Sequence, residues 1–263
     1  MNRYRILFLL LIAATTLPFN ALAQGNNVKY KHEKENDVQF RTGFDFEKKM
    51  CKRFSLSWNE ELRIKNDFKD IDRIYSGLSG SVKIADWVKM SAAYTFISVY
   101  QQKKKSEAHG AWDLRHRLSA DITFSYKTYN NWKFSLRERV QTTFLTEDHI
   151  DHREKENPDW ALKSRVMAEY EFSQIPLSPY TSIELCNTLK VPHYVGHNYL
   201  EKVRSAIGTE YKINKRNYID IFYRFDYNRE KKIKVKNSTG ELKSFTTAKS
   251  YNNIFCVSYK FKF

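Results

Sequence analysis

The chain of 263 residues contains little cysteine, proline or glycine: 3 Cys, 5 Pro and 8 Gly. So few cysteines exclude a small secreted module held together by disulfides, and the spacing of the three fits neither a zinc site nor a redox pair. Beyond the N-terminal region there is no uninterrupted apolar stretch of about 18 residues, so no transmembrane helix is expected. No phosphate-binding glycine loop is present, and we expect no cofactor.

Charge and aromatic residues are abundant. The 45 Lys and Arg residues outnumber the 30 Asp and Glu residues, which gives a formal net charge of +15, and aromatic residues make up 15% of the chain. So many large apolar side chains exclude a disordered chain. The mean hydropathy of -0.65 argues against a helical membrane protein. It is compatible with a membrane β-barrel, whose strands alternate apolar and polar residues and are hydrophilic on average.

The N-terminal residues have the form of a secretory signal peptide. Arg3 and Arg5 precede the apolar run 6–17, and Ala21 and Ala23 form a small-residue cleavage pattern before Gln24. We therefore predict a cleaved signal peptide at residues 1–23 and a mature exported chain at residues 24–263. Export removes nucleic acid as a partner, despite the basic charge.

The mature chain has an apolar residue at every second position along most of its length. In residues 53–65, for example, Phe54, Leu56 and Trp58 are separated by polar residues. Alternation of this kind places one set of side chains on each face of a β-strand. It predicts an all-β chain with strands at 38–48, 53–65, 72–85, 88–101, 111–127, 131–145, 159–173, 178–190, 198–213, 217–229 and 250–263.

The lengths of the predicted connections alternate along the chain. Short turns are expected at 49–52, 86–87, 128–130, 173–177 and 214–216, and longer polar loops at 66–71, 102–110, 146–158, 191–197 and 230–249. Short turns at one end and long loops at the other are typical of an up-and-down antiparallel outer-membrane barrel with periplasmic turns. We therefore predict a transmembrane β-barrel in the outer membrane of a Gram-negative bacterium.

The C-terminal strand supports this prediction. It alternates large apolar with polar residues and ends on an aromatic residue, which resembles the signal that the outer-membrane barrel assembly machinery recognises; its apolar positions are Phe255, Val257, Tyr259, Phe261 and Phe263. That machinery and periplasmic chaperones are the expected assembly partners, and membrane lipid is the expected environment.

The number of strands needs one further assumption. Eleven runs are visible, but both chain ends of such a barrel normally lie in the periplasm, which requires an even number. We therefore predict twelve strands, with a weak first strand at about 26–33. Ten remain possible if two runs pair differently.

The layout resembles a family of uncharacterised outer-membrane β-barrel proteins found mainly in Bacteroidetes, of the domain of unknown function 2490 type. The resemblance lies in residues 54–63 (FSLSWNEELR), 112–117 (WDLRHR), 177–180 (LSPY) with Glu184 following, 219–224 (IDIFYR) and the aromatic terminus. It covers nearly the whole mature chain. It implies a barrel in the outer membrane, and it supplies neither an activity nor catalytic residues.

If the apolar set faces lipid, the polar set lines the interior. We expect these lumen-lining residues to be Arg63, Arg115, Arg117, Asp121, Arg137, Arg139, Lys163, Arg165, Glu169, Glu171, Glu184, Arg204, Glu210, Asp220, Arg224 and Asp226. One interpretation is a small porin-like channel, in which the basic band at positions 115, 117, 137 and 139 favours anions. The other is a non-catalytic surface barrel whose interior is filled by salt bridges.

The hairpins predict which of these charges face each other. A three-residue turn at 128–130 places Asp121 opposite Arg137. Matching the apolar faces of the last hairpins places Arg204 opposite Asp226. The same register opposes Glu210 and Asp220, a like-charge pair that needs a nearby cation or water. The corresponding step across 173–178 sets Glu169 opposite Glu184.

An outer-membrane enzyme acting on lipid is the alternative function. Such an enzyme needs a serine and a histidine within hydrogen-bond reach on the outer face. The weak candidates are His116, with Thr142 as its expected cross-strand neighbour, and Glu138, whose position on a lipid-facing surface is unusual. A local bulge that turns Glu138 inward is the simpler explanation, so no catalytic residue is predicted.

The remaining features are weaker. Residues 147–154 carry two His and four acidic residues that could bind a divalent cation, but a solvated acidic loop is preferred and no metal site is predicted. Lysines at 103–105 and at 231, 232, 234 and 236 could attract lipopolysaccharide phosphates. Cys186 and Cys256 are expected to face inward and Cys51 to lie in a turn. A soluble periplasmic ligand-binding barrel is the last alternative, and it would place the aromatic residues inside.

Overall fold

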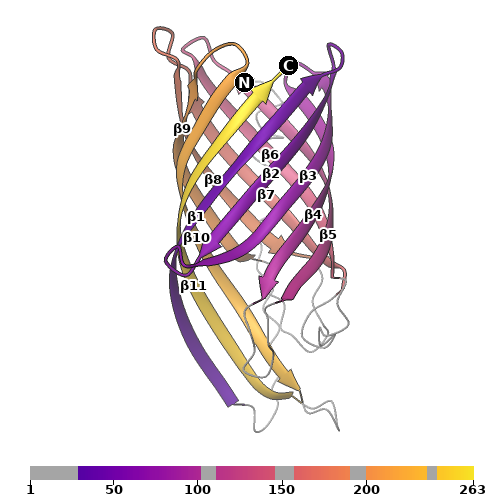
Figure 1. Ribbon diagram of the computed structural model, residues 1–263, viewed down its shortest axis with the longest axis vertical. Coiled ribbons are helices and arrows are strands. Elements are labelled where there is room, and N and C mark those ends of the chain that lie inside the picture. The colour runs from indigo at the N-terminus through magenta and orange to yellow at the C-terminus, as the bar shows by residue number, and fades with distance from the viewer. Residues whose placement is uncertain (1–28, 102–110, 146–156, 190–199, 236–241) are drawn as a thin grey trace, which may run out of the picture.

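The computed structural model describes residues 29–101, 111–145, 157–189, 200–235 and 242–263. Eleven strands form one closed barrel, in which each strand lies beside its neighbours in the chain and β1 closes against β11 (Figure 1). No helix in this part of the chain is long and apolar enough to span a membrane. The strands are β1 (Lys29–Lys49), β2 (Phe54–Lys65), β3 (Asp70–Ala85), β4 (Val88–Gln101), β5 (Ala111–Lys127), β6 (Trp132–Leu145), β7 (Asp159–Tyr170), β8 (Leu177–Thr188), β9 (Leu200–Lys212), β10 (Asn217–Val235) and β11 (Leu242–Lys262).

The barrel has eleven strands, and the twelve that we predicted are wrong. We predicted an even number because we assumed that both chain ends of the barrel lie on the same side. Instead, β1 pairs with β11 in parallel, and this pairing closes a barrel with an odd number of strands. Of the weak first strand expected at 26–33, the described residues, from Lys29 onward, form the beginning of β1 instead. Every other neighbouring pair of strands is antiparallel.

Three strands are longer than the alternation indicated. β1 begins at Lys29 rather than 38, β10 continues to Val235, and β11 begins at Leu242 rather than 250. Pairing of β1 with β2 stops at Phe40 and pairing of β10 with β9 stops at Asn228. The three strands therefore continue as a sheet of their own beyond the rim (Figure 1). We call this sheet the three-stranded extension. The end of the barrel from which it projects is called the loop end. The opposite end is called the turn end, and its connections are 50–53, 86–87, 128–131, 171–176 and 213–216.

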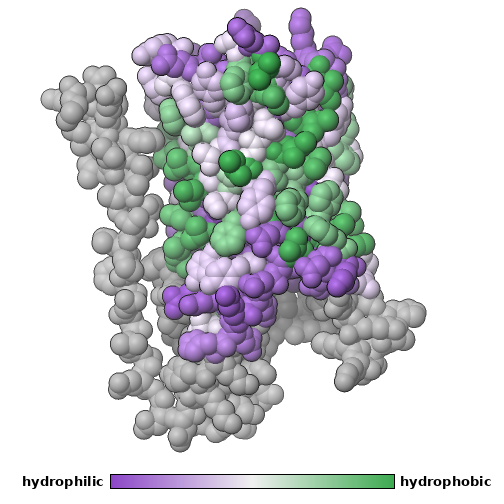
Figure 2. Space-filling model, turned by 90° about the vertical axis from the view of Figure 1, so that its left-hand side faces the viewer, coloured by the Kyte–Doolittle hydropathy of each residue, from purple (hydrophilic) through white to green (hydrophobic). Residues whose placement is uncertain are grey.

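The outer surface of the barrel is apolar and its interior is polar. Large apolar side chains on alternate strand positions are well exposed, among them Leu78 at 57%, Ile183 at 56% and Ile207 at 64%. On the face seen in Figure 2 they form a belt between two hydrophilic ends. Charged residues such as Glu184 and Asp226 are buried. This distribution is the reverse of that in a soluble protein, where the apolar side chains are buried.

Two glycines lie where neighbouring strands come very close. A Cβ atom added at Gly208 on β9 would lie 2.3 Å from the Cβ of Phe222 on β10 and 2.7 Å from the carbonyl oxygen of Ile221. A Cβ at Gly43 would lie 2.3 Å from the carbonyl oxygen of Glu60. At Gly80, by contrast, the nearest heavy atom would be 3.5 Å away, which is an ordinary contact.

We predict that Gly208→Ala destabilises the barrel by about 1–3 kcal/mol, because the added methyl group forces β9 and β10 apart. The measurement is the urea concentration at which half of the refolded protein in detergent is unfolded. The heat-dependent shift in electrophoretic mobility distinguishes folded from unfolded protein. Gly80→Ala is the matched control and should change the midpoint little. Equal midpoints for the two variants would show that the close approach of β9 to β10 does not make the barrel sensitive to an added methyl group.

Candidate functional site in the barrel interior

Glu184 on β8 is the centre of a buried network of ion pairs. Its Oε2 lies 2.7 Å from Nη2 of Arg137 on β6, and its Oε1 lies 2.7 Å from Nη1 of Arg204 on β9. Arg137 reaches Glu184 past β7, so this contact joins two strands that are not paired with each other. Burial removes water from the carboxylate, which costs free energy. The two guanidinium groups compensate for this cost, whereas a lone buried charge would have no compensation.

The network continues toward β10. Asp226 lies opposite Arg204, with 3.4 Å between its Oδ2 and the arginine Nε, and its Oδ1 lies 2.9 Å from Nε of Arg224. The Asp226 side chain is only 3% exposed. Arg137, Glu184, Arg204, Asp226 and Arg224 therefore form one chain of alternating charge from β6 to β10, which we call the interior network.

A second group of side chains fills the opposite side of the interior. Tyr75 on β3 is buried together with Ile97 and Val99 of β4. The guanidinium carbon of Arg63 lies 4.0 Å from the centre of the Tyr75 ring, and that of Arg117 lies 5.7 Å from it. Arginines on β2 and β5 thus both lie within cation–π distance of one ring.

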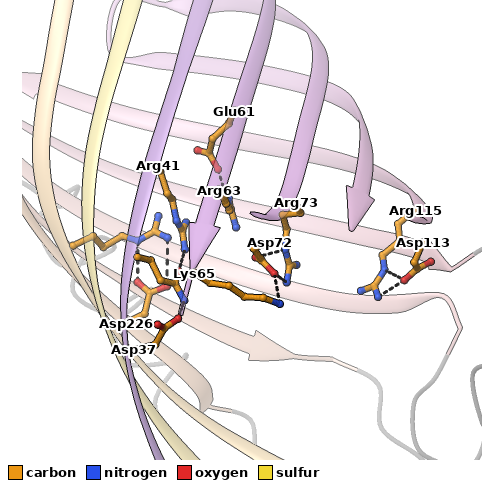
Figure 3. A network of polar contacts seen from close by, with 12 residues as sticks. Asp37, Arg41, Glu61, Arg63, Lys65, Asp72, Arg73, Asp113, Arg115 and Asp226 are labelled. Carbon is orange, nitrogen blue, oxygen red and sulfur yellow. Dashed lines mark hydrogen bonds and ion pairs between the residues drawn. The ribbon is translucent and has the colours of Figure 1, made fainter. Parts of the chain in front are cut away.

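A group of ion pairs lines the interior on β2, β3 and β5 near the loop end (Figure 3). Asp72 pairs with Arg73 at 2.6 Å and with Lys65 at 3.2 Å. Nε of Arg115 donates to Asp113 at 2.7 Å. Closer to the middle of β2, Arg63 pairs with Glu61 two positions along the same strand. Each of these acids is held by a base on its own or the adjacent strand.

Lys260 on β11 occupies the turn end of the interior. Glu210 and Asp220 face each other as the hairpin register predicted. The cation that such a like-charge pair needs is Lys260, whose Nζ lies 2.9 Å from Glu210 and 3.1 Å from Asp220. Asp220 also accepts a hydrogen bond of 2.8 Å from the Tyr180 hydroxyl group.

The predicted pairing of Arg204 with Asp226 is confirmed, but two other predicted pairs are wrong. Asp121 lies opposite Arg139, which donates to it at 2.7 Å, and not opposite Arg137. The turn is longer than three residues, because Asn131 adopts a positive φ of 62° and Lys127 pairs with Lys133. This moves the register by two residues.

Glu184 lies opposite Arg165, and Glu169 lies opposite Tyr180. The predicted Glu169–Glu184 pair is therefore wrong as well. The turn closes earlier than we assumed, with the amide of Phe172 donating to the carbonyl of Leu177. Glu169 instead pairs with Lys133 of β6 at 2.8 Å.

Two of the other interior candidates, Arg117 and Glu171, have local partners. Nε of Arg117 donates to Thr143 at 3.1 Å, and Glu171 pairs with Lys127 at the turn end. Lys163 lies opposite Arg139 and Cys186. Cys186 and Cys256 are buried and Cys51 is exposed in a turn, as predicted.

Several interior residues were missed from the sequence. Tyr75, Ile97 and Ile254 are buried at 6%, 1% and 0% exposure, although we assigned apolar residues to the outer face. β4 is apolar on both faces, so alternation could not separate its two sides. Lys260 stood at a polar position of the C-terminal strand, and this position was the signal that could have identified it.

The outer face does not bring the two catalytic candidates together. His116 lies opposite Phe144, not Thr142, and its Nδ1 lies 2.7 Å from the Tyr94 hydroxyl group. Glu138 lies opposite Ile122, six positions further along the register, which corresponds to about 20 Å. No bulge turns Glu138 inward, and it accepts a hydrogen bond of 2.6 Å from Ser164.

The C-terminal strand presents its aromatic residues on the outer face. Phe255 is 48% exposed and Phe263 is 62% exposed, and the rings of Phe261 and Phe263 lie 4.5 Å apart. Within the residues that the structure describes, no group of three His, Cys, Asp or Glu side chains could hold a metal ion. The acidic segment 147–154 and the lysines at 103–105 and 236 lie outside these residues.

The family model described as "Protein of unknown function (DUF2490)" matches residues 38–237, which run from the middle of β1 to just beyond the end of β10. A search of the curated proteins finds no match.

We predict that Glu184→Gln destabilises the barrel by about 3–5 kcal/mol, because Arg137 and Arg204 lose the carboxylate between them and remain buried. The measurement is again the urea midpoint of the refolded protein. Glu171→Gln removes the same charge from the far more exposed pair with Lys127, and should cost less than about 1 kcal/mol. Similar losses for the two variants would show that the interior network contributes no more than a surface pair.

Proposed function

The chain belongs to the DUF2490 family, and we propose that it is an outer-membrane β-barrel of a Gram-negative bacterium whose interior is closed by ion pairs. It would act as a non-catalytic surface barrel rather than as an open channel. Export through the N-terminal signal peptide and insertion by the barrel assembly machinery, guided by the aromatic C-terminal strand, are parts of the same proposal.

The inverted distribution of side chains supports a membrane location. The exposed apolar positions face outward from a closed barrel, and a closed barrel leaves no unpaired strand edge in lipid. The belt between hydrophilic ends matches the apolar band of outer-membrane barrels. A soluble ligand-binding barrel would require the opposite faces.

One observation carries the proposal of a closed interior: several inward side chains are almost inaccessible to water. Asp113 and Asp226 are 1% and 2% exposed, and Ile97 and Ile254 are 1% and 0% exposed. A water-filled pore would leave the residues that line it exposed. An eleven-stranded barrel is wider than the filled barrels of eight strands, but the interior network and the Tyr75 cluster fill it from two sides.

We predict that the refolded protein gives no steady conductance in a planar bilayer. Arg137→Ala/Glu184→Ala/Arg204→Ala removes three side chains of the interior network and should open conducting steps. Lys52→Ala/Asp86→Ala/Arg216→Ala changes two bases and one acid at the turn end, and should leave the barrel sealed. Steady anion-selective steps from the unaltered protein would favour the small-channel interpretation instead.

Cys51 provides a test of orientation, because it is exposed in a connection at the turn end. Backbone hydrogen bonds from Arg53 and Phe54 lower the pKa of the Cys51 thiol. More thiolate is therefore present at neutral pH, and the thiolate is the form that reacts with maleimide.

We predict that a maleimide carried on a large polyethylene glycol chain does not label Cys51 in intact cells and labels it once the outer membrane is permeabilised. A Cys51→Ser/Lys69→Cys variant moves the exposed thiol to the β2–β3 turn at the loop end and should be labelled in intact cells. The reverse pattern would show the opposite orientation, and identical labelling of both variants in intact cells would contradict insertion in the outer membrane.

A further inference from the structure

Three basic residues stand side by side on the outer face of the three-stranded extension. Lys249 of β11 lies opposite Arg229 of β10 on one side and opposite Lys34 of β1 on the other. All three are exposed. Like charges directly opposite each other destabilise a sheet, so this row of cations is unfavourable unless an anion binds to it. We call it the cation row.

A row of tyrosines lies next to the cation row on the same face. Tyr227 and Tyr251 are cross-strand partners two positions closer to the barrel, and their ring centres are 5.3 Å apart. Nζ of Lys34 lies 5.2 Å from the centre of the Tyr251 ring. The order along this face, from the barrel outward, is therefore apolar, tyrosine, then cation.

A surface cavity of about 240 Å³ adjoins the cation row. Its lining combines two lysines and a histidine with an aromatic ring, a threonine and one acid: His32, Glu33, Lys34, Thr247, Lys249 and Tyr251. Backbone pairing of β1 with β11 fixes His32 opposite Thr247, and Lys34 opposite Lys249. The cavity is thus formed by regular strands and does not depend on a loop.

The position of the cation row corresponds to a membrane interface. At about 3.3 Å per residue and a tilt of about 40°, Tyr251 lies about 30 Å from Phe263 along the barrel axis. Outer-membrane barrels have an apolar band about 25 Å tall, flanked by aromatic residues. If Phe263 marks one boundary of the band, Tyr227 and Tyr251 stand at the other, and the cation row reaches the head-group layer.

We propose that the cation row, together with Tyr251 and the adjoining cavity, binds the phosphate groups of a phosphorylated glycolipid in the leaflet at the loop end. This inference rests on the proposed insertion in the outer membrane. Guanidinium and ammonium groups are the usual protein ligands of phosphate. The tyrosines contact the apolar part of the lipid while the cations bind its head group, as amphipathic rings do at membrane interfaces.

The test compares lipid binding by the full mature barrel and by a charge-neutral variant of the row, Lys34→Gln/Arg229→Gln/Lys249→Gln. Each protein is refolded in detergent and titrated with bisphosphorylated lipid A or with the same lipid lacking its phosphates. Bound lipid is counted by native mass spectrometry. We expect the unaltered barrel to prefer the phosphorylated lipid, and the row variant to bind it at least about tenfold more weakly.

Two controls separate the row from general charge. Lys52→Gln/Arg53→Gln/Lys215→Gln removes the same charge from the turn end and should bind lipid A as the unaltered barrel does. Lys34→Arg/Lys249→Arg keeps the charges of the row and should also retain binding. Unaltered binding by the row variant, or an equal loss in the turn-end variant, would overturn the proposal.

Two further readouts make the outcome specific. Inorganic phosphate at millimolar concentration should not displace lipid A, and displacement would show a site for free phosphate instead. The heat-dependent mobility shift of the protein in lipid vesicles reports insertion independently. An inserted barrel without preference for phosphorylated lipid contradicts only this inference, whereas a barrel that never inserts contradicts the proposed function as well.

Discussion

The charged residues of this barrel must lie inside a narrow space, and they are stable there only when each acid meets a base. Because strand residues alternate between two faces, a strand that exposes apolar residues outward has to turn its polar residues inward. Glu184 shows how the requirement is met, since it lies between arginines from β6 and β9. Two of the interior pairs, Arg137–Glu184 and Lys260–Glu210, connect strands that share no backbone hydrogen bonds, and the others join residues of the same or adjacent strands.

The turns decide which charges meet. A shift of two residues keeps every side chain on its face but gives it a new partner, as the change from Arg137 to Arg139 opposite Asp121 shows. Asn131 produces this shift by adopting a left-handed conformation that asparagine tolerates well. Arg137 is thereby left to pair with Glu184 across β7, so the conformation of one turn determines a contact between strands that are not neighbours.

The sequence predicted the strands well where one face is apolar and the other polar. It failed where that contrast is missing: the beginnings of β1 and β11 and the end of β10 show no regular alternation of apolar and polar residues, so the alternation could not predict how far these strands extend. The parallel contact between β1 and β11 could not be predicted, because alternation carries no information about strand direction. For the interior site, the sequence could predict which polar residues face inward. It could not predict the pairing of Arg137 with Glu184, because that pairing depends on the curvature of the barrel.

A filled interior changes where function can be located. Side chains such as Asp226 and Ile254, at 2% and 0% exposure, have no free surface for a solute. In the function that we propose, the interior therefore serves as a scaffold. The surfaces that remain available are the two rims and the outer face. Parallel closure makes one rim different from the other, because β1, β10 and β11 all extend past the loop end. The row of Arg229, Lys249 and Lys34 stands on that extension, where repulsion between neighbouring cations is relieved by an anion rather than by a partner strand.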